Sequence, residues 1–113
     1  MAESVSLAVL ENLVHMNRED FPVGYVVIGA VIPTNVYITS YDQLRAVQGD
    51  LEPQTLGDRW IESETSAVLR VPSAVVPSEF NYVLNPRHRD FPRIVAEIGI
   101  PFTFDERLFQ KRR

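Results

Sequence analysis

The sequence contains no cysteine, and its 113 residues include only two histidines. The absence of cysteine excludes a disulfide framework, a zinc ribbon and a cysteine nucleophile. His15 and His88 are too isolated to suggest a metal site, and the sequence has no P-loop and no His-Glu-x-x-His pattern, so we expect no metal. A chain without disulfides fits a reducing compartment, and we expect it in the cytoplasm.

Long hydrophobic runs are also missing. The longest, residues 25–32, stops at Pro33, whereas crossing a bilayer takes roughly 20 apolar residues. The first basic side chain is Arg18, so the N-terminus does not carry the basic region of a signal peptide. We therefore expect neither a membrane span nor export.

Positive charge is scarce over most of the chain. Residues 1–86 hold four basic and eleven acidic side chains, and residues 87–113 hold seven basic and four acidic ones. The net charge is −4 and the isoelectric point is about 5.1, which argues against binding of nucleic acid driven by charge. We expect no direct nucleic-acid partner. The basic C-terminal segment either docks a protein partner or balances the acidic remainder.

The composition is that of a globular protein, with 45% hydrophobic and 23% charged residues. The length predicts a single domain over residues 1–113. Apolar residues at three- and four-residue steps predict a first helix that is capped by Ser4 or Ser6 and ends near Arg18-Glu19-Asp20, before Pro22. A second amphipathic helix is predicted to begin at Thr55 and cover residues 56–64.

Six short segments have the composition of strands: residues 25–32, 36–38, 67–71, 82–84, 94–98 and 101–104. The continuous apolar pattern of residues 25–32 predicts a strand that is buried on both faces. Residues 39–42 offer the capping chemistry of a short helical turn, and residues 48–53 predict a surface loop. Several strands lie too close together for helical crossovers, so we expect a compact α+β domain with a mixed sheet.

Four polar residues lie where a purely structural pattern would not require them. Glu11 lies beside the apolar stripe of the first helix, Ser73 follows the strand 67–71, and Asn81 and Asn85 bracket the strand 82–84. Each also has a plain structural explanation. Glu11 would lie at the boundary between the apolar and the solvated face of its helix, Ser73 would stabilise a turn, and the two asparagines would end the hydrogen bonding of a strand. Side chains at strand ends are also common in functional sites, and the pattern alone leaves both explanations open.

Three stretches of the chain resemble the RES domain family. They are residues 60–88, WIESETSAVLRVPSAVVPSEFNYVLNPRH, residues 4–15, SVSLAVLENLVH, and residues 101–109, PFTFDERLF. Members of this family are toxins of Xre–RES toxin–antitoxin pairs. The resemblance implies a fold similar to that of ADP-ribosyltransferase toxins, an activity that consumes NAD+ as a substrate without a further cofactor, and an Xre-type antitoxin as partner.

The resemblance also implies roles for the four polar residues. Glu11 matches the family's glutamate and Ser73 its serine, so both are expected to be catalytic, with Asn81 and Asn85 as neighbours that bind NAD+. Cleavage of the nicotinamide–ribose bond passes through an oxocarbenium-like transition state, which a carboxylate stabilises. The hydroxyl of Ser73 would donate to or accept from the ribose or the nicotinamide.

The family's arginine lies upstream of the glutamate helix, in a Gly-Arg-Trp-Asn-like segment that this sequence does not contain. We therefore expect the chain to lack roughly the first third of a full RES domain. An uncovered strand edge would then favour association with a second copy or with another protein. Arg70, in the predicted strand 67–71, could grip the NAD+ phosphates in place of that arginine. The structural alternative for Arg70 is an ion pair.

Three functions remain open at this stage. The first is an enzyme that consumes NAD+ as a glycohydrolase, a phosphorylase or an ADP-ribosyltransferase. The second is a non-catalytic module that only binds an Xre-type antitoxin. The third is a small hydrolase built on Ser73 and His88, although no Gly-x-Ser-x-Gly elbow frames that serine.

Overall fold

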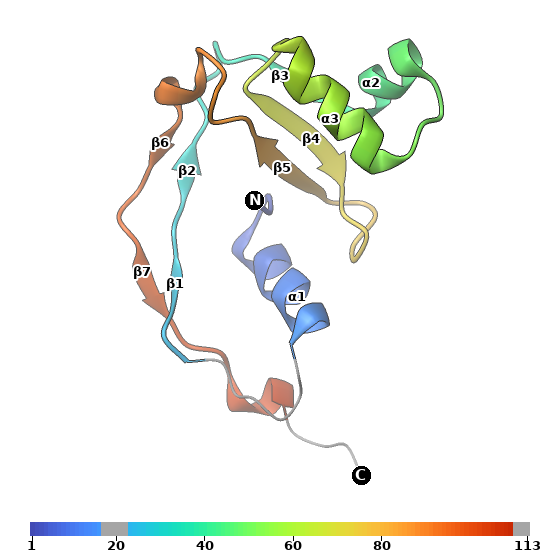
Figure 1. Ribbon diagram of the computed structural model, residues 1–113. Coiled ribbons are helices and arrows are strands. Elements are labelled where there is room, and N and C mark those ends of the chain that lie inside the picture. The colour runs from blue at the N-terminus through green and yellow to red at the C-terminus, as the bar shows by residue number, and fades with distance from the viewer. Residues whose placement is uncertain (17–22, 110–113) are drawn as a thin grey trace.

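A computed structural model describes residues 1–16 and 23–109 of the chain (Figure 1). The elements are α1 (Val5–His15), β1 (Tyr25–Val27), β2 (Ala30–Val31), β3 (Ile38–Ser40), α2 (Tyr41–Gln48), α3 (Pro53–Ser63), β4 (Val68–Pro72), β5 (Phe80–Leu84), β6 (Val95–Ala96) and β7 (Ile100–Phe102), with single 3-10 turns at Phe91–Arg93 and Glu106–Phe109. This mixture of helices and short strands confirms the predicted α+β class.

The central sheet has the strand order β3-β4-β5 and is mixed, as predicted. β3 runs parallel to β4, and β5 runs antiparallel to β4. The segment 1–3 extends this sheet along the outer edge of β5. There Tyr82 N–H donates to Met1 O over 2.6 Å, Glu3 N–H donates to Phe80 O over 3.1 Å, and Ala2 forms a bridge with Asn81. The start of the chain is therefore fixed directly beside β5.

One face of the sheet is covered by α2 and α3 (Figure 1). Leu44 of α2 and Leu56 and Trp60 of α3 pack together with Leu69 of β4 and form the main apolar core. α2 is longer than the predicted short turn, because Ser40 and Gln43 form a capping box whose two hydrogen bonds satisfy free N–H groups at its start.

A buried hydroxyl joins this core to the sheet. Ser66 Oγ donates to Val68 O over 2.8 Å and accepts from Trp60 Nε1 over 2.9 Å, and Thr39 Oγ1 lies 2.6 Å away. A hydroxyl has one hydrogen and two lone pairs, so Thr39 must be the donor in the last of these bonds. Ser66 thus accepts a hydrogen bond from the indole N–H of Trp60, the only tryptophan in the sequence, and links α3, β3 and β4.

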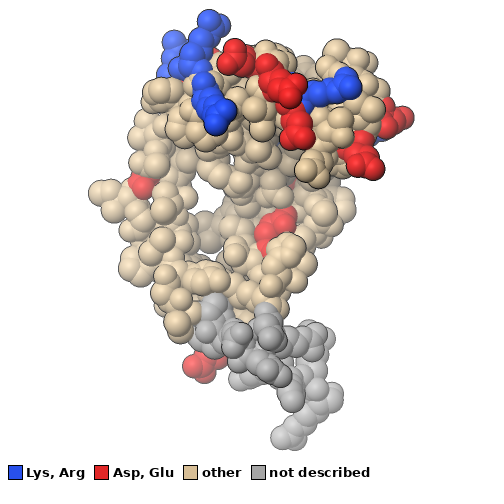
Figure 2. Space-filling view, in the orientation of Figure 1, with Lys and Arg blue, Asp and Glu red and all other residues tan. Residues whose placement is uncertain are grey.

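The second substructure is a long antiparallel ribbon, in which β1 pairs with β7 and β2 with β6 (Figure 1). The prediction of one strand over residues 25–32, buried on both faces, is wrong. The strand is interrupted at Ile28 and Gly29, and Val26 is 56% exposed. Gly29 has no side chain to pack, and within the described residues each half of the strand pairs on one side only. Figure 2 shows few charged side chains on this ribbon compared with the end that holds α2 and α3.

Other boundaries differ by a few residues. α1 ends at His15, earlier than predicted, and Arg18-Glu19-Asp20 lie outside the described residues. α3 begins at Pro53, which is favoured in the first turn of a helix because it has no N–H to satisfy. No helix in the described part of the chain has the length and hydrophobicity of a membrane span.

Replacing Ser66 by alanine should destabilise the domain. The change leaves Trp60 Nε1 and the Thr39 hydroxyl buried without their partner, which costs about 1–3 kcal/mol of unfolding free energy. Urea unfolding followed by the fluorescence of Trp60 measures this loss. Ser78→Ala, at an exposed turn, is the matched control, and equal unfolding free energies for the two variants would contradict the assigned role of Ser66.

Candidate functional site

Three segments that are distant in sequence converge on the carboxylate of Glu11. Ser73 Oγ donates to Glu11 Oε1 over 2.6 Å, and Asn81 Nδ2 donates to the same oxygen over 2.8 Å. The two partners lie 62 and 70 residues from Glu11 along the chain. The structure therefore brings together three of the four polar residues that the sequence singled out.

The fold positions these side chains through neighbouring elements. α1 begins right after the segment that pairs with β5, and Ser4 caps it by accepting a hydrogen bond from Leu7 N–H. Leu7 is buried, and Glu11 follows it by one helical turn on the same side of α1. Asn81 lies in β5 opposite Val71 of β4, and Ser73 follows β4 directly. The carboxylate thus meets the end of β4 and the start of β5.

Ser73 is 2% exposed and uses its full hydrogen-bonding capacity. Its hydrogen goes to Glu11, and its oxygen accepts from Val75 N–H over 3.1 Å and Val76 N–H over 3.0 Å. Its own N–H donates to Glu79 O. A hydroxyl that is satisfied in this way has no further hydrogen bond to offer, and it holds the Glu11 carboxylate in place.

The hydrogen bond from Ser73, followed by that from Asn81, lowers the pKa of Glu11 below its ordinary value of 4.5. The charge of His15, one turn along α1, lowers it further, and partial burial opposes the shift. Both hydrogen bonds end on Oε1, whereas Oε2 accepts none from the described residues. At neutral pH the site therefore holds an ionised carboxylate with one oxygen available.

The structure does not bring Asn85 or His88 to this cluster. Asn85 lies past the far end of β5, where its Oδ1 accepts from Arg87 N–H and stabilises a turn. Both ring nitrogens of His88 are engaged, Nε2 with Glu64 O and Nδ1 with Asp90 N–H. Ser73 and His88 share no hydrogen bond, so the geometry offers no support for the hydrolase hypothesis. A role of Asn85 in binding NAD+ stays a prediction.

Arg70 lies on the other side of the sheet from Asn81. It is paired in register with Tyr82, and neighbouring residues of a strand point to opposite faces. Its guanidinium stacks on the ring of Phe80, 4.9 Å from the centroid, and its Nε is buried without a hydrogen-bond partner. Arg70 forms no ion pair with the described residues, and it does not reach the cluster around Glu11.

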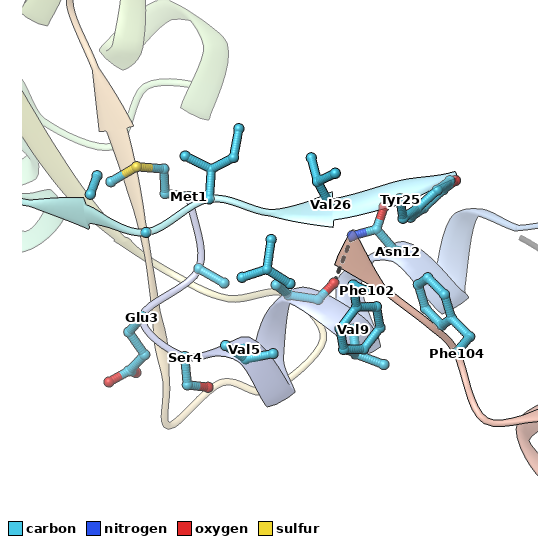
Figure 3. Close-up of a pocket in the computed structure, with 16 residues that line it drawn as sticks. Met1, Glu3, Ser4, Val5, Val9, Asn12, Tyr25, Val26, Phe102 and Phe104 are labelled. Carbon is cyan, nitrogen blue, oxygen red and sulfur yellow. Dashed lines mark hydrogen bonds between the residues drawn. The ribbon is translucent and has the colours of Figure 1, made fainter. Parts of the chain in front are cut away.

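A cavity of about 410 Å³ lies on a different side of α1, between this helix and the ribbon (Figure 3). Val5, Val9 and Asn12 line it from α1, and Tyr25 and Phe102 line it from β1 and β7. Glu11, Ser73 and Asn81 do not line it. Sequence reasoning missed this cavity, because it forms between elements that are distant in the sequence. Within the described ranges no group of His, Asp or Glu side chains could hold a metal ion.

The fold and the site together define a small α+β domain with an ionised carboxylate fixed by a buried serine. A family model described as the RES domain matches residues 1–105. The chain is 35% identical over 119 residues to "Toxin Res" of Photorhabdus laumondii and 36% identical over 114 residues to "Toxin Res" of Yersinia enterocolitica. It is 31% identical over 118 residues to the "Prs ADP-ribosylating toxin" of Sphingobium sp..

These three matches cover 96% to 100% of the chain and 73% to 76% of the relatives. The chain belongs to the RES domain family, which confirms the resemblance inferred from residues 60–88. The name of the Sphingobium relative agrees with the predicted similarity to the fold of ADP-ribosyltransferase toxins.

Ser73→Ala should raise the pKa of Glu11 toward its ordinary value, because the largest cause of the lowering is removed. A carboxyl whose pKa is lowered in the folded state stabilises the fold above its ordinary pKa and loses that contribution as the pH falls through the lowered pKa. The unfolding free energy of the variant should therefore fall less than that of the wild type as the pH is lowered. A carbon-detected NMR titration of the Glu11 carboxyl measures the shift, with Ser78→Ala as control. An unchanged titration would contradict the assignment.

Proposed function

We propose that this chain acts as a toxin that consumes NAD+, with the Glu11 carboxylate as its central catalytic group. The observation that carries the proposal is the placement of Glu11 Oε1 between Ser73 and Asn81, which leaves Oε2 without a hydrogen bond from the described residues. The family match covers all three residues. The name of the Sphingobium relative supports ADP-ribosyl chemistry in particular.

The proposed reaction breaks the bond between the nicotinamide nitrogen and C1′ of the ribose. The electron pair leaves with nicotinamide, positive charge develops on the ribose, and an oxygen of water, phosphate or a protein side chain then bonds to C1′. A fixed anion close to the ribose stabilises this positive charge without first having to reorganise. Glu11 Oε2 is the atom that meets this requirement, because the two hydrogen bonds to Oε1 orient the carboxylate and favour its ionised form.

Ser73 and Asn81 have the role of positioning residues in this mechanism. Ser73 donates its single hydroxyl hydrogen to Glu11. A direct hydrogen bond donated by Ser73 to NAD+, as expected from the sequence, would require the bond between Ser73 and Glu11 to break. Asn81 uses one N–H of its side-chain amide on Glu11, and an amide has a second N–H and an oxygen for a ligand. Asn81 is therefore the better candidate of the two for contact with NAD+.

An Xre-type antitoxin is the proposed partner, as the family resemblance implies. Leu10 and Val14 are 43% and 61% exposed and lie on the side of α1 next to Glu11. A protein that packs on these two side chains would also cover the free oxygen of Glu11. Binding of this kind would suppress the activity without any change in the site itself.

Incubation of the purified chain with NAD+ tests the proposal, with released nicotinamide measured by liquid chromatography. The wild-type chain should release nicotinamide, and Glu11→Gln should lower the rate by about 10²- to 10³-fold, because the neutral amide cannot stabilise the positive charge. Glu62→Gln removes an exposed carboxylate of α3 and is the matched control. It should leave the rate unchanged.

Expression in bacteria distinguishes the enzyme hypothesis from the hypothesis of a non-catalytic binding module. Growth arrest with falling NAD+ levels that requires Glu11 and is relieved by a co-expressed Xre-type antitoxin would support the full proposal. Constant NAD+ levels, combined with binding to that antitoxin, would overturn the catalytic part and favour a module that only occupies the antitoxin.

A further inference from the structure

A second cavity, of about 440 Å³, lies between α2, α3 and the outer edge of β3. β3 pairs only with β4 within the described residues, so this edge of the sheet is open. The site containing Glu11 lies at the end of β4 and at β5, and the cavity shares no residue with it. Figure 1 shows α1 beyond the β5 edge of the sheet, whereas α2 and α3 lie by β3 and β4.

The walls of this cavity combine apolar surface with hydrogen-bond donors. Leu44, Val47, Tyr37 and Trp60 provide the apolar part. Its volume falls within the range of roughly 300–1,000 Å³ that is usual for small-molecule sites, which are mostly apolar with a few polar groups. The ligand that suits such walls has a hydrophobic body.

Two glutamines, Gln43 and Gln48, line the cavity. Gln43 Oε1 accepts from Ser40 N–H over 3.0 Å in the capping box of α2. Gln48 Oε1 accepts from Arg59 Nη1 over 2.9 Å. Each amide oxygen therefore accepts one hydrogen bond, and the NH₂ group of each side chain makes none with the described residues. Both NH₂ groups are available to donate to a ligand.

The charge of the cavity has a single sign. Arg59 lines it, and no Asp or Glu does. Among the described residues no carboxylate lies within salt-bridge distance of Arg59, whereas the neighbouring Arg45 is paired with Asp50 at 2.7 Å. A guanidinium bound only to a neutral amide has N–H groups left for an anion, and arginine is well suited to hold a carboxylate.

We propose that this cavity binds a small organic anion, with its carboxylate held by Arg59 and the NH₂ groups of Gln43 and Gln48 and its apolar body against Leu44, Val47 and Trp60. This site is separate from the site around Glu11 and does not depend on the proposed consumption of NAD+. The structural alternative is that Arg59 and Gln48 serve only to link α3 to α2.

Titration with 4-phenylbutanoate tests the proposal, with neutral 4-phenylbutanamide as the matched probe. The anion should bind with a dissociation constant on the order of 1 mM, as expected for a probe of this size. Saturable changes should appear in the side-chain NH₂ signals of Gln43 and Gln48 in ¹⁵N NMR spectra and in the fluorescence of Trp60, the only tryptophan. Equal binding of the amide, or no saturable change, would overturn the proposal.

Two variants test the role of charge. Arg59→Gln should weaken binding of the anion at least about tenfold, since a charge-assisted hydrogen bond is lost. Gln48→Glu should abolish binding, because the new carboxylate pairs with Arg59 and repels the ligand. Gln54→Glu makes the same change at an exposed position of α3 outside the cavity and should bind like wild type. If Gln48→Glu binds as well as Gln54→Glu while both retain the wild-type backbone spectrum, the site is not an anion site.

Discussion

The hydrogen bond between Ser73 and Glu11 is the contact on which the arrangement around the candidate site depends. It joins α1 to the end of β4, and the same oxygen of Glu11 joins α1 to β5 through Asn81. α1 has little other buried surface, since Leu7 is its only fully buried residue. This polar contact therefore helps to hold the helix beside the sheet, and it lowers the pKa of the Glu11 carboxyl.

The division of the Glu11 carboxylate into one engaged and one free oxygen follows from this contact. A carboxylate with two free oxygens would turn about its own axis, and a carboxylate with both oxygens bonded would have nothing left for a substrate. The buried serine avoids both conditions, because its remaining bonds to Val75 and Val76 fix its own position. The turn after β4 is in this sense part of the site, although it contributes only backbone N–H groups to it.

Sequence patterns predicted the parts of this fold that depend on local chemistry. The capping of α1 by Ser4 or Ser6 and the central strands 67–71 and 82–84 came from residue type and spacing. The same patterns singled out Glu11, Ser73 and Asn81, but the roles of Glu11 and Ser73 came from the family resemblance. The exposure of residues 25–32 could not be predicted, because a run of apolar residues does not reveal how many neighbours its strand will have. The sequence placed Asn81 and Asn85 at opposite ends of one strand, but only the contact between α1 and β5 shows which of the two lies beside Glu11. The cavities depend on contacts between distant elements and leave no short-range signal.

The pairing of residues 1–3 with β5 also determines which kinds of sequence change this site can tolerate. The bonds between Met1 and Tyr82 and between Glu3 and Phe80 set the distance from the sheet at which α1 begins. One residue inserted or deleted between Ser4 and Glu11 would turn the carboxylate by about 100° around the helix, away from both of its partners. The spacing within this short stretch is thus constrained as tightly as the identity of Glu11 itself, and substitutions on the exposed face of α1 are accommodated more easily than any change in its length.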